Sequence, residues 1–280
     1  MKKTKYYIAS CSCGKDSIAM VLKLLALGYP LTHVIFYNTG MEFDAILNNW
    51  KKLVKILEEH GVITVHLQPE TSFLMQMLIN PVNKKDGSIG FGYDWCGGVC
   101  RWRTTDKVVA IKKFLDSLDG DYIQYIGYAV DEPDRVNNKL SQIGNKRFPL
   151  VELNMTEADC LQYCYDNGFD WMEDGVELYS ILKRVSCWCC KNKNLEELRN
   201  IYHFLPRYWG YLKGLQSRID RPFYTDKTIF ELEERFKLED AGKWKIRKCK
   251  KKKSTIQVKT TIDTTVTTTR TEIYEQLSLF

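Results

Sequence analysis

The chain has 280 residues, a formal net charge of +6 and ten cysteines. Its length is sufficient for one sizeable core with an appendage. No apolar stretch approaches the roughly 20 residues that a membrane span needs, which excludes a membrane-spanning protein and favours a cytoplasmic one. Without a secretion signal, this many cysteines indicate metal, cluster or redox chemistry rather than a disulfide framework.

Strand-like and helix-like patterns alternate along the first 170 residues. The predicted strands lie at 6–9, 32–37, 62–68, 122–129 and 149–153. The predicted helices between them lie at 16–27, 43–60, 104–117 and 156–167. This alternation predicts an α/β fold with a doubly wound, mostly parallel sheet. Ligands of such sheets bind beyond the carboxyl ends of the strands, at the switch point of the strand order.

Three regions follow from these patterns. Residues 1–170 are expected to form the α/β domain, with a Cys-containing insertion at 80–103. Residues 171–242 are expected to form a small helical, Cys-rich lobe, with helices at 194–216 and 228–240. The tail at 243–280 holds ten Lys and Arg against three Asp and Glu, so the positive charge is concentrated there. We expect a flexible basic linker from 245 onward, although the Thr/Val/Ile alternation equally suits a strand.

The most informative segment is the octapeptide Ser-Cys-Ser-Cys-Gly-Lys-Asp-Ser at 10–17, between the first predicted strand and helix. Backbone N–H groups and the helix dipole at such a junction favour phosphate binding. Gly14 is expected to permit a backbone conformation closed to bulkier residues. Ser12 and Ser17 add hydroxyls and Lys15 adds charge. Asp16 is a candidate helix cap or Mg²⁺ ligand.

The loop is not a Walker A motif, because Ala9 stands where that motif needs its first glycine. Residues 12–17 instead resemble the S-G-G-K-D-S loop of the PP-loop ATP-pyrophosphatase superfamily, with Cys13 at a glycine position. Three later segments resemble, in the same order, the phosphoadenosine phosphosulfate (PAPS) reductase family. They are F-Y-N-T-G-M-E-F at 36–43, G-Y-A-V-D-E-P-D-R at 127–135, and F-P-L-V-E at 148–152 followed by M-T-E-A-D at 155–159.

This resemblance covers about residues 6 to 216 and implies an adenine nucleotide site, with ATP or a PAPS-like nucleotide and Mg²⁺. The implied nucleotide-binding residues are Ser12, Gly14, Lys15, Asp16, Ser17, Thr39, Gly40, Asp131 and Arg135. Lys15, Asp16 and Cys187 are the candidate catalytic residues. Arg101 and Arg103 are candidates to grip phosphate or sulfate, or else surface ion-pair partners.

Two cysteine clusters have the spacing of a four-thiolate site. Cys96 and Cys100 lie in W-C-G-G-V-C-R, and Cys187 and Cys190 lie in C-W-C-C. Together they would supply four ligands, with Cys189 as a substitute. By resemblance to family members related to DNA sulfur modification, a [4Fe-4S] cluster is favoured. Structural zinc and metal-free thiols are the alternatives.

The other cysteines have less specific settings. Cys160 and Cys164, four residues apart on a predicted helix, favour core packing. Cys13 favours a small residue tolerated at a glycine position over a reactive thiol. The E-C-G-L-H motif that sulfonucleotide reductases share is absent from the sequence, and Cys249 between lysines is a poor substitute. This places the reduction of PAPS to sulfite in doubt.

The last five residues resemble the Q-L-S/D-L-F peptide that docks bacterial replication and repair proteins on the sliding clamp. They are Gln276, Leu277, Ser278, Leu279 and Phe280. Three apolar side chains on a mobile tail suit an apolar groove, and the preceding lysines suit phosphates, so DNA is a candidate partner. The alternative is a terminal segment packed on its own domain.

Three functions are consistent with the sequence. The first is adenylation-coupled sulfur transfer by a PP-loop enzyme, with nucleic acid as a candidate acceptor. The second is a sulfonucleotide reductase with a nucleophile other than the usual cysteine, Cys249 or one of residues 187–190. The third is a non-catalytic nucleotide-binding protein tethered to the sliding clamp.

Overall fold

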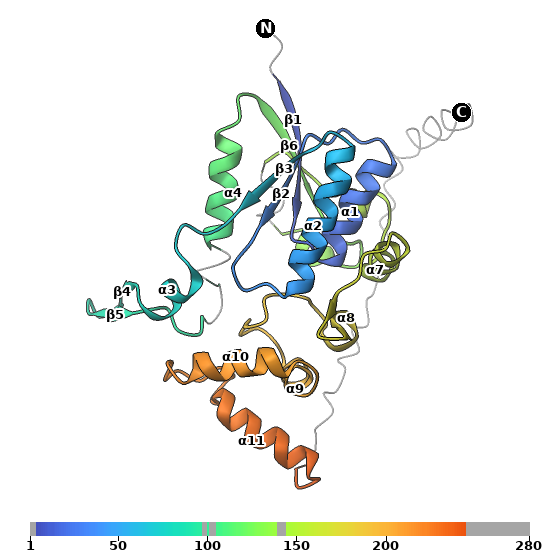
Figure 1. Ribbon diagram of the computed structural model, residues 1–280. Coiled ribbons are helices and arrows are strands. Elements are labelled where there is room, and N and C mark those ends of the chain that lie inside the picture. Colours follow the sequence, from blue (N-terminus) through green and yellow to red (C-terminus); the bar gives the residue numbers. More distant parts are fainter. Residues whose placement is uncertain (1–3, 97–99, 101–104, 139–143, 245–280) are drawn as a thin grey trace, which may run out of the picture.

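The computed structural model describes residues 4–96, 100, 105–138 and 144–244 (Figure 1). Five strands form one sheet in the order β3-β2-β1-β6-β7, and every neighbouring pair is parallel. The strands are β1 (Lys5–Cys11), β2 (His33–Tyr37), β3 (Ile63–Leu67), β6 (Asp121–Ile126) and β7 (Lys146–Arg147). The predicted α/β fold with a parallel sheet is therefore confirmed.

The strand order reverses between β1 and β6. From β1 the chain builds outward through β2 to β3, and it then returns to place β6 on the other side of β1. The carboxyl ends of β1 and β6 therefore flank the switch point, where doubly wound sheets bind ligands. The loop at 12–14 follows β1 directly, and Gly127 follows β6.

Helices cover both faces of the sheet (Figure 1). On one face lie α1 (Lys15–Ala26) and α2 (Asp44–Glu59), with α7 (Glu157–Asp166) packed against α1. The apolar stripe of α2 recurs at helical spacing, with Ile46, Trp50, Leu53 and Leu57 all buried. On the opposite face, α4 (Asp106–Asp116) buries Leu115 against the sheet.

A small appendage follows β3. It holds α3 (Phe73–Leu78) and the antiparallel hairpin of β4 (Pro81–Asn83) and β5 (Ile89–Phe91), which extends away from the sheet (Figure 1). Ser72 caps α3 by accepting a hydrogen bond from the Met75 N–H. This hairpin lies within the insertion predicted at 80–103.

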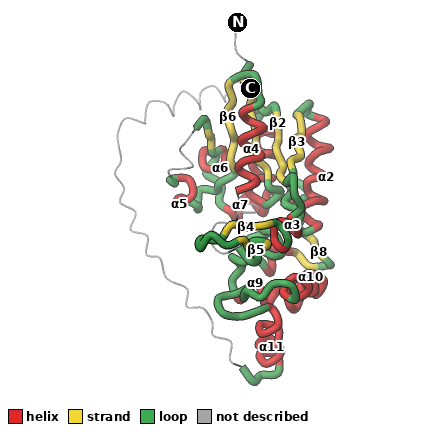
Figure 2. Tube along the Cα trace, turned by 90° about the vertical axis from the view of Figure 1, so that its left-hand side faces the viewer, coloured by secondary structure: helices red, strands yellow, loops and turns green. Residues whose placement is uncertain are grey.

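The later elements lie below the carboxyl ends of the strands (Figure 2). They are β8 (Met172–Glu173), β9 (Val176–Glu177), α8 (Leu178–Ile181), α9 (Leu195–Phe204), α10 (Pro206–Gln216) and α11 (Ile229–Asp240). The helix predicted at 194–216 is two helices, because Pro206 begins a new one after Leu205. Capping boxes at Asn194 and Thr228 fix the starts of α9 and α11.

The strand predicted at 149–153 is wrong. These residues form the short helix α6 (Pro149–Glu152), preceded by the short helix α5 (Pro133–Val136) and by β7, which takes the edge position in the sheet. Pro149 has no N–H for a sheet ladder, and its fixed φ suits the first position of a helix. The N–H groups of Val151 and Leu153 close the turn on Phe148 and Pro149.

None of the helices within the described ranges is both long and apolar enough to cross a lipid bilayer. The tail from 245 onward, including Cys249 and the five C-terminal residues, lies outside the described residues, as do Arg101 and Arg103. The predictions made for them remain predictions. The division into a sheet domain and a Cys-rich lobe also remains a prediction.

Candidate functional site

The loop between β1 and α1 is closed by its own serines. Ser17 Oγ donates to the Gly14 carbonyl oxygen at 3.0 Å and accepts from the Ser12 N–H at 3.1 Å. The two hydroxyl oxygens lie 3.3 Å apart. The strand–turn–helix setting that the sequence predicts for this loop is present, and α1 begins at Lys15.

The unusual backbone conformation falls on Cys13 rather than on Gly14. Cys13 has a φ of 57°, in the left-handed region that favours glycine. Gly14 has a φ of −80°, which any residue adopts, so the expectation that its backbone is special is wrong. What Gly14 provides is space, because a Cβ there would lie 3.3 Å from the Tyr179 hydroxyl.

Both thiols of the loop region are buried. Cys11 Sγ and Cys13 Sγ lie 3.8 Å apart, and the indole N–H of Trp171 donates to the Cys13 carbonyl oxygen at 2.9 Å. Burial raises the pKa of the Cys13 thiol well above its usual range. These two side chains are therefore part of the core, as the small-residue interpretation predicts for Cys13.

Lys15 is held by two carboxylates. Its Nζ lies 2.9 Å from Asp16 Oδ1 and 2.6 Å from Glu157 Oε2, and the residue is only 6% exposed. Burial favours a lower pKa, but the charges of Asp16 and Glu157 outweigh it, so the pKa of Lys15 is raised. Burial also raises the pKa of Asp16, against the opposing charge of Lys15. Asp16 does not cap α1, which has no side-chain cap.

The segment after β6 lies beside the loop. A Cβ on Gly127 would lie 3.0 Å from both the Asp16 carbonyl oxygen and Ser17 Cα, so only glycine allows this close approach. The Asp131 carboxylate accepts from the Glu157 N–H at 3.0 Å and so fixes the start of α7. Asp131 is thus placed at the site through its contact with Glu157.

Arg135 and Arg184 share one carboxylate. Arg135 Nη1 lies 2.7 Å from Glu132 Oε1, and Arg184 Nη2 lies 3.3 Å from the same oxygen. Arg135 also lies over the Tyr128 ring, 4.2 Å from its centroid. Burial favours a lower pKa for Arg135, but the hydrogen bond and charge of Glu132, with a smaller effect from Asp16, raise it.

The turn after β2 meets the cysteine segment. Thr39 Oγ1 donates to Glu42 Oε1 at 2.7 Å and lies 3.5 Å from Cys187 Sγ. Cys187 Sγ in turn lies 3.8 Å from Glu42 Oε1. Gly40 has a φ of 77°, and its N–H donates to Asn38 Oδ1, which shapes the turn. Two segments that are 148 residues apart in sequence are therefore joined here.

A cavity of about 510 Å³ lies between the start of α7 and the segment that runs from Lys183 to Glu197. Its lining is basic and polar and includes one thiol. The lining residues are Glu157, Lys183, Arg184, Ser186, Cys190, Asn192, Lys193 and Glu197. Glu157, which pairs with Lys15, and the Cys190 thiol both line this cavity.

The four predicted metal ligands are only partly gathered. The Cys190 N–H donates to the Cys187 carbonyl oxygen at 3.1 Å. Burial lowers the pKa of Lys191, and the charge of Cys96 opposes this effect in part. Within the described ranges, no three His, Cys, Asp or Glu side chains are placed to hold one metal ion. As placed, the thiols do not form the ligand set, and the four-cysteine site remains a sequence-based prediction.

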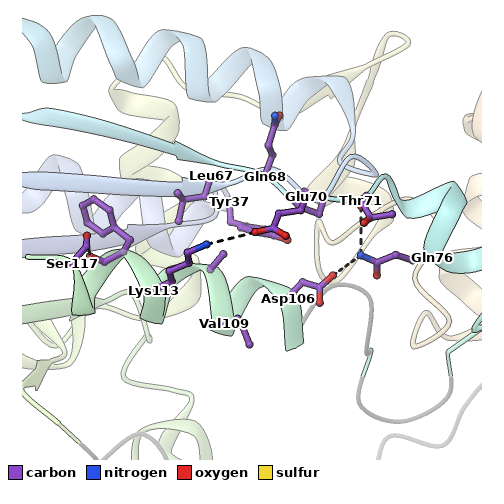
Figure 3. Close-up of a pocket in the computed structure, with 13 residues that line it drawn as sticks. Tyr37, Leu67, Gln68, Glu70, Thr71, Gln76, Asp106, Val109, Lys113 and Ser117 are labelled. Atoms are coloured by element: carbon purple, nitrogen blue, oxygen red, sulfur yellow. Dashed lines mark hydrogen bonds and ion pairs between the residues drawn. The ribbon is translucent and has the colours of Figure 1, made fainter. Parts of the chain in front are cut away.

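A second cavity of about 570 Å³ lies between α4 and the carboxyl ends of β2 and β3 (Figure 3). The Tyr37 side chain lines it, and its buried hydroxyl has no hydrogen-bond partner within the described residues. Gln76 Nε2 donates to Asp106 Oδ2 at 2.7 Å on one side, and Lys113 pairs with Glu70 at 3.6 Å near Tyr37. Burial, with a smaller effect from Asp106, raises the pKa of Tyr37 to about 12.

Sequence reasoning missed several of these residues. Glu157 stands in the quoted M-T-E-A-D segment, but its pairing with Lys15 depends on α7 packing against α1. Tyr179 reaches the loop from 164 residues away, and no sequence pattern indicated it. Arg184 was missed for the same reason, because its partner Glu132 lies 52 residues earlier in the sequence.

Comparisons with known proteins establish no family for the chain. No protein-family model matches it. It is 25% identical over 228 residues to the uncharacterized protein MJ0066 of Methanocaldococcus jannaschii. That alignment covers 74% of this chain and 41% of the relative, so the chain spans less than half of the relative's length.

One solved structure similar to the chain is the U34-tRNA thiolase NcsA from Methanococcus maripaludis with its [4Fe-4S] cluster. The TM-score is 0.42 at 13% sequence identity, over 85% of this chain and 74% of the thiolase. A similarity of this degree carries no conclusion about the function of the present chain.

Proposed function

We propose that the chain is a PP-loop enzyme that binds ATP or a related adenine nucleotide and uses adenylation to drive sulfur transfer. The observation that carries this proposal is the position of the Ser12–Ser17 loop. It connects β1 to α1 at the switch point of a parallel sheet, with Lys15 at the first helical position. Its residue order resembles the PP-loop, and its surroundings include carboxylates, arginines and a thiol.

The phosphates of the nucleotide bind at the loop. The N–H groups at the start of α1 and the helix dipole attract negative charge, and the exposed Ser12 supplies a hydroxyl. Lys15 supplies a positive charge. Nucleotide binding requires little further desolvation of this ammonium, because it is already buried and paired with Asp16 and Glu157. These groups stabilise the charge that develops on the α-phosphate.

Mg²⁺ accompanies the nucleotide. Asp16, Glu157 and Asp131 are the carboxylates around the loop, but they do not by themselves form a metal site within the described residues. Mg²⁺ commonly uses only one or two carboxylates together with phosphate oxygens and water. One or two of these carboxylates would therefore serve as ligands of a Mg²⁺ ion that arrives with the nucleotide, and the ion would neutralise negative charge on the phosphates.

The base of the nucleotide occupies the cavity beneath α4. Tyr37, which ends β2, lines that cavity two residues before Thr39. Leu115 of α4 packs with Ile8 of β1 and Ile35 of β2, so α4 lies on the strand that leads into the loop. An aromatic base fits the apolar wall of Leu67 and Phe114, and its polar edge supplies the partner that the Tyr37 hydroxyl lacks.

The chemistry has two displacements. An acceptor oxygen attacks the α-phosphorus of ATP, and pyrophosphate leaves. A sulfide ion then attacks the activated carbon, a carbon–sulfur bond forms, and AMP leaves with the acceptor oxygen. The basic cavity beside Glu157 is the place for the acceptor, because Lys183 and Arg184 suit the phosphates of a nucleic acid.

Docking on DNA or on the sliding clamp through residues 276–280 remains part of the proposal. These residues lie outside the described ranges, so the proposal rests on the sequence alone. The same applies to the basic run before them.

One observation favours the reductase alternative. The Cys190 thiol lines the same cavity as Glu157, which pairs with Lys15 of the loop, so this thiol is a candidate to attack a phosphosulfate bound at the loop. Its thiolate would attack the sulfonyl sulfur, the nucleotide would leave as a bisphosphate, and a second thiol would release sulfite by forming a disulfide. That reaction consumes PAPS and releases no pyrophosphate.

The test is the release of pyrophosphate from ATP by the full-length chain with Mg²⁺, with and without bulk tRNA or DNA as acceptor. Lys15→Ala is expected to reduce the release about 100-fold or more, which is a usual loss when one transition-state donor is removed. Lys23→Ala, on the last turn of the same helix, is the matched control and should retain activity. Release of a bisphosphate from PAPS without pyrophosphate from ATP would favour the reductase.

A further inference from the structure

The start of α1 is occupied by a phenol from a distant helix. The Lys15 N–H donates to the Tyr179 hydroxyl oxygen at 2.9 Å. Lys15 is the first residue of α1, and no side chain from its own N-cap, Gly14, satisfies the helix end. The hydroxyl oxygen of Tyr179 therefore bonds one of the free N–H groups that make a helix N-terminus a phosphate site.

The phenol is held firmly against the loop. The Tyr179 hydroxyl is so close to Gly14 that a Cβ added there would lie 3.3 Å from it. The Lys15 ammonium lies 5.6 Å from the centre of the Tyr179 ring. Trp171 packs edge-on to the same ring at 4.8 Å, and its indole N–H donates to the Cys13 carbonyl oxygen. Two aromatic residues from the region after α7 thus contact consecutive parts of the loop.

A phosphate oxygen and the phenol compete for the same donor. The Lys15 N–H carries one proton, so it cannot make a full hydrogen bond to both. On this basis, which rests on the proposed function, we propose that Tyr179 holds the place of a phosphate oxygen in the nucleotide-free loop and moves when the nucleotide binds. Tyr179 is a positioning residue in this proposal and takes no part in the chemistry.

The displacement is transmitted to the cysteine segment. Tyr179 lies on α8, and the chain continues directly from α8 through Lys183 to Cys187 and Cys190. The end of α8 is tied to α9, because Asn200 Nδ2 donates to the Ile181 carbonyl oxygen and Glu197 accepts from the Lys183 N–H. Phosphate binding at the loop therefore changes the packing of the segment that lines the basic cavity.

The first experiment measures the binding of Mg²⁺–pyrophosphate and of adenosine by calorimetry to the full-length chain and to Tyr179→Phe. The phenylalanine keeps the ring and removes the competitor, so pyrophosphate should bind about two- to tenfold more tightly, and adenosine should be unaffected. If the hydroxyl only stabilised the loop, Tyr179→Phe would bind pyrophosphate more weakly instead. Unchanged or weaker pyrophosphate binding would overturn the inference and leave the proposed function standing.

Tyr165→Phe is the matched control. Tyr165 also packs edge-on to Trp171, at 6.4 Å, but its hydroxyl interacts with Glu177 rather than with the loop. Its pyrophosphate affinity should equal that of the unmodified chain. If neither the unmodified chain nor Tyr179→Phe binds pyrophosphate or ATP at millimolar concentration, the proposed function is wrong and the inference fails with it.

The second experiment needs no variant. Hydrogen–deuterium exchange of peptides covering 178–190 should increase in the unmodified chain when Mg²⁺–pyrophosphate is added, because Tyr179 leaves its position on α1. Peptides from α11 should not change. Unchanged or slower exchange at 178–190, under conditions where pyrophosphate binds, would contradict the proposed displacement.

Discussion

The Glu157 carboxylate accepts from the Lys15 ammonium at 2.6 Å across 142 residues of sequence. This contact joins the start of α7 to the loop between β1 and α1, and Asp131 joins the segment after β6 to the same place through the Glu157 N–H. Three of the four segments that carry the resemblance to a nucleotide-binding family, 12–17, 127–135 and 155–159, therefore meet around one lysine.

Glu157→Gln is expected to lower the free energy of unfolding by about 1 kcal/mol. The Glu157 side chain is 38% exposed and Lys15 retains Asp16, so the loss stays near that of one charged hydrogen bond screened by solvent. Urea denaturation measures it. Asp116→Asn removes a partner of the exposed Lys112–Asp116 pair and should leave the stability essentially unchanged, because solvent screens this pair. Equal changes in the free energy of unfolding for the two variants would contradict a stabilising contribution of the Lys15–Glu157 pair.

Gly127→Ala should disturb the loop from the opposite side. Its Cβ would lie 3.0 Å from Ser17 Cα and from the Asp16 carbonyl oxygen, so the start of α1 must shift. We expect a loss of about 1–3 kcal/mol in stability and weaker binding of ATP. Gly210→Ala is the control, because nothing lies within 4 Å of the added carbon and alanine favours the helix. ATP binding by Gly127→Ala at the unmodified affinity would refute the close approach.

Tyr37→Phe should weaken the binding of adenine nucleotides without lowering the stability of the fold. The Tyr37 hydroxyl is buried without a partner in the described structure, so its removal should leave stability unchanged or raise it by up to about 1 kcal/mol. Adenine nucleotides should bind about two- to tenfold more weakly if that hydroxyl contacts the base. Tyr125→Phe removes another such hydroxyl, on β6, and should affect neither property adversely. Thermal unfolding and calorimetry check both expectations.

Stability should fall as the pH rises above about 9. Burial raises the pKa of the Cys160 thiol from 9.0 to about 12, so the unfolded chain loses this proton first. Stability is fully present below pH 9.0 and is lost as the pH rises toward 12, at up to about 1.4 kcal/mol per pH unit for this group. Cys160→Ala should make the fall shallower. If the stability of Cys160→Ala, measured by urea denaturation, fell with pH between 9 and 11 as steeply as that of the unmodified chain, the Cys160 thiol would not be responsible for the fall.

The four-cysteine site is tested by metal content after anaerobic purification. A cluster on Cys96, Cys100, Cys187 and Cys190 predicts about four irons per chain and broad absorption near 400 nm, as expected for a four-thiolate cubane cluster. The double variant Cys187→Ser/Cys190→Ser should lose both, whereas Cys160→Ser/Cys164→Ser, in the core, should retain them if it folds. Zinc without colour would support the tetrahedral alternative, and a metal-free protein would refute the site.

The sequence by itself determined the α/β alternation, the parallel sheet and the position of the phosphate-type loop. These depend on local periodicity and on residues adjacent in the chain, such as Ser12, Gly14 and Ser17. The same local reasoning failed at Pro149, where an apolar run that suits a strand contains a residue that cannot donate to a ladder and instead begins a helix.

Only the tertiary structure decided which residues surround the loop. Glu157 and Tyr179 come from segments far along the chain, and their contacts exist because α7 packs on α1 and because α8 folds beneath the carboxyl ends of the strands. In the same way, Cys187 comes from a distant segment to contact Thr39 in the turn after β2. Such contacts depend on how helices pack in space, which no periodicity along the chain records. Tyr179 in particular has no motif around it, because a single phenol that bonds a helix end needs only the right position in the fold.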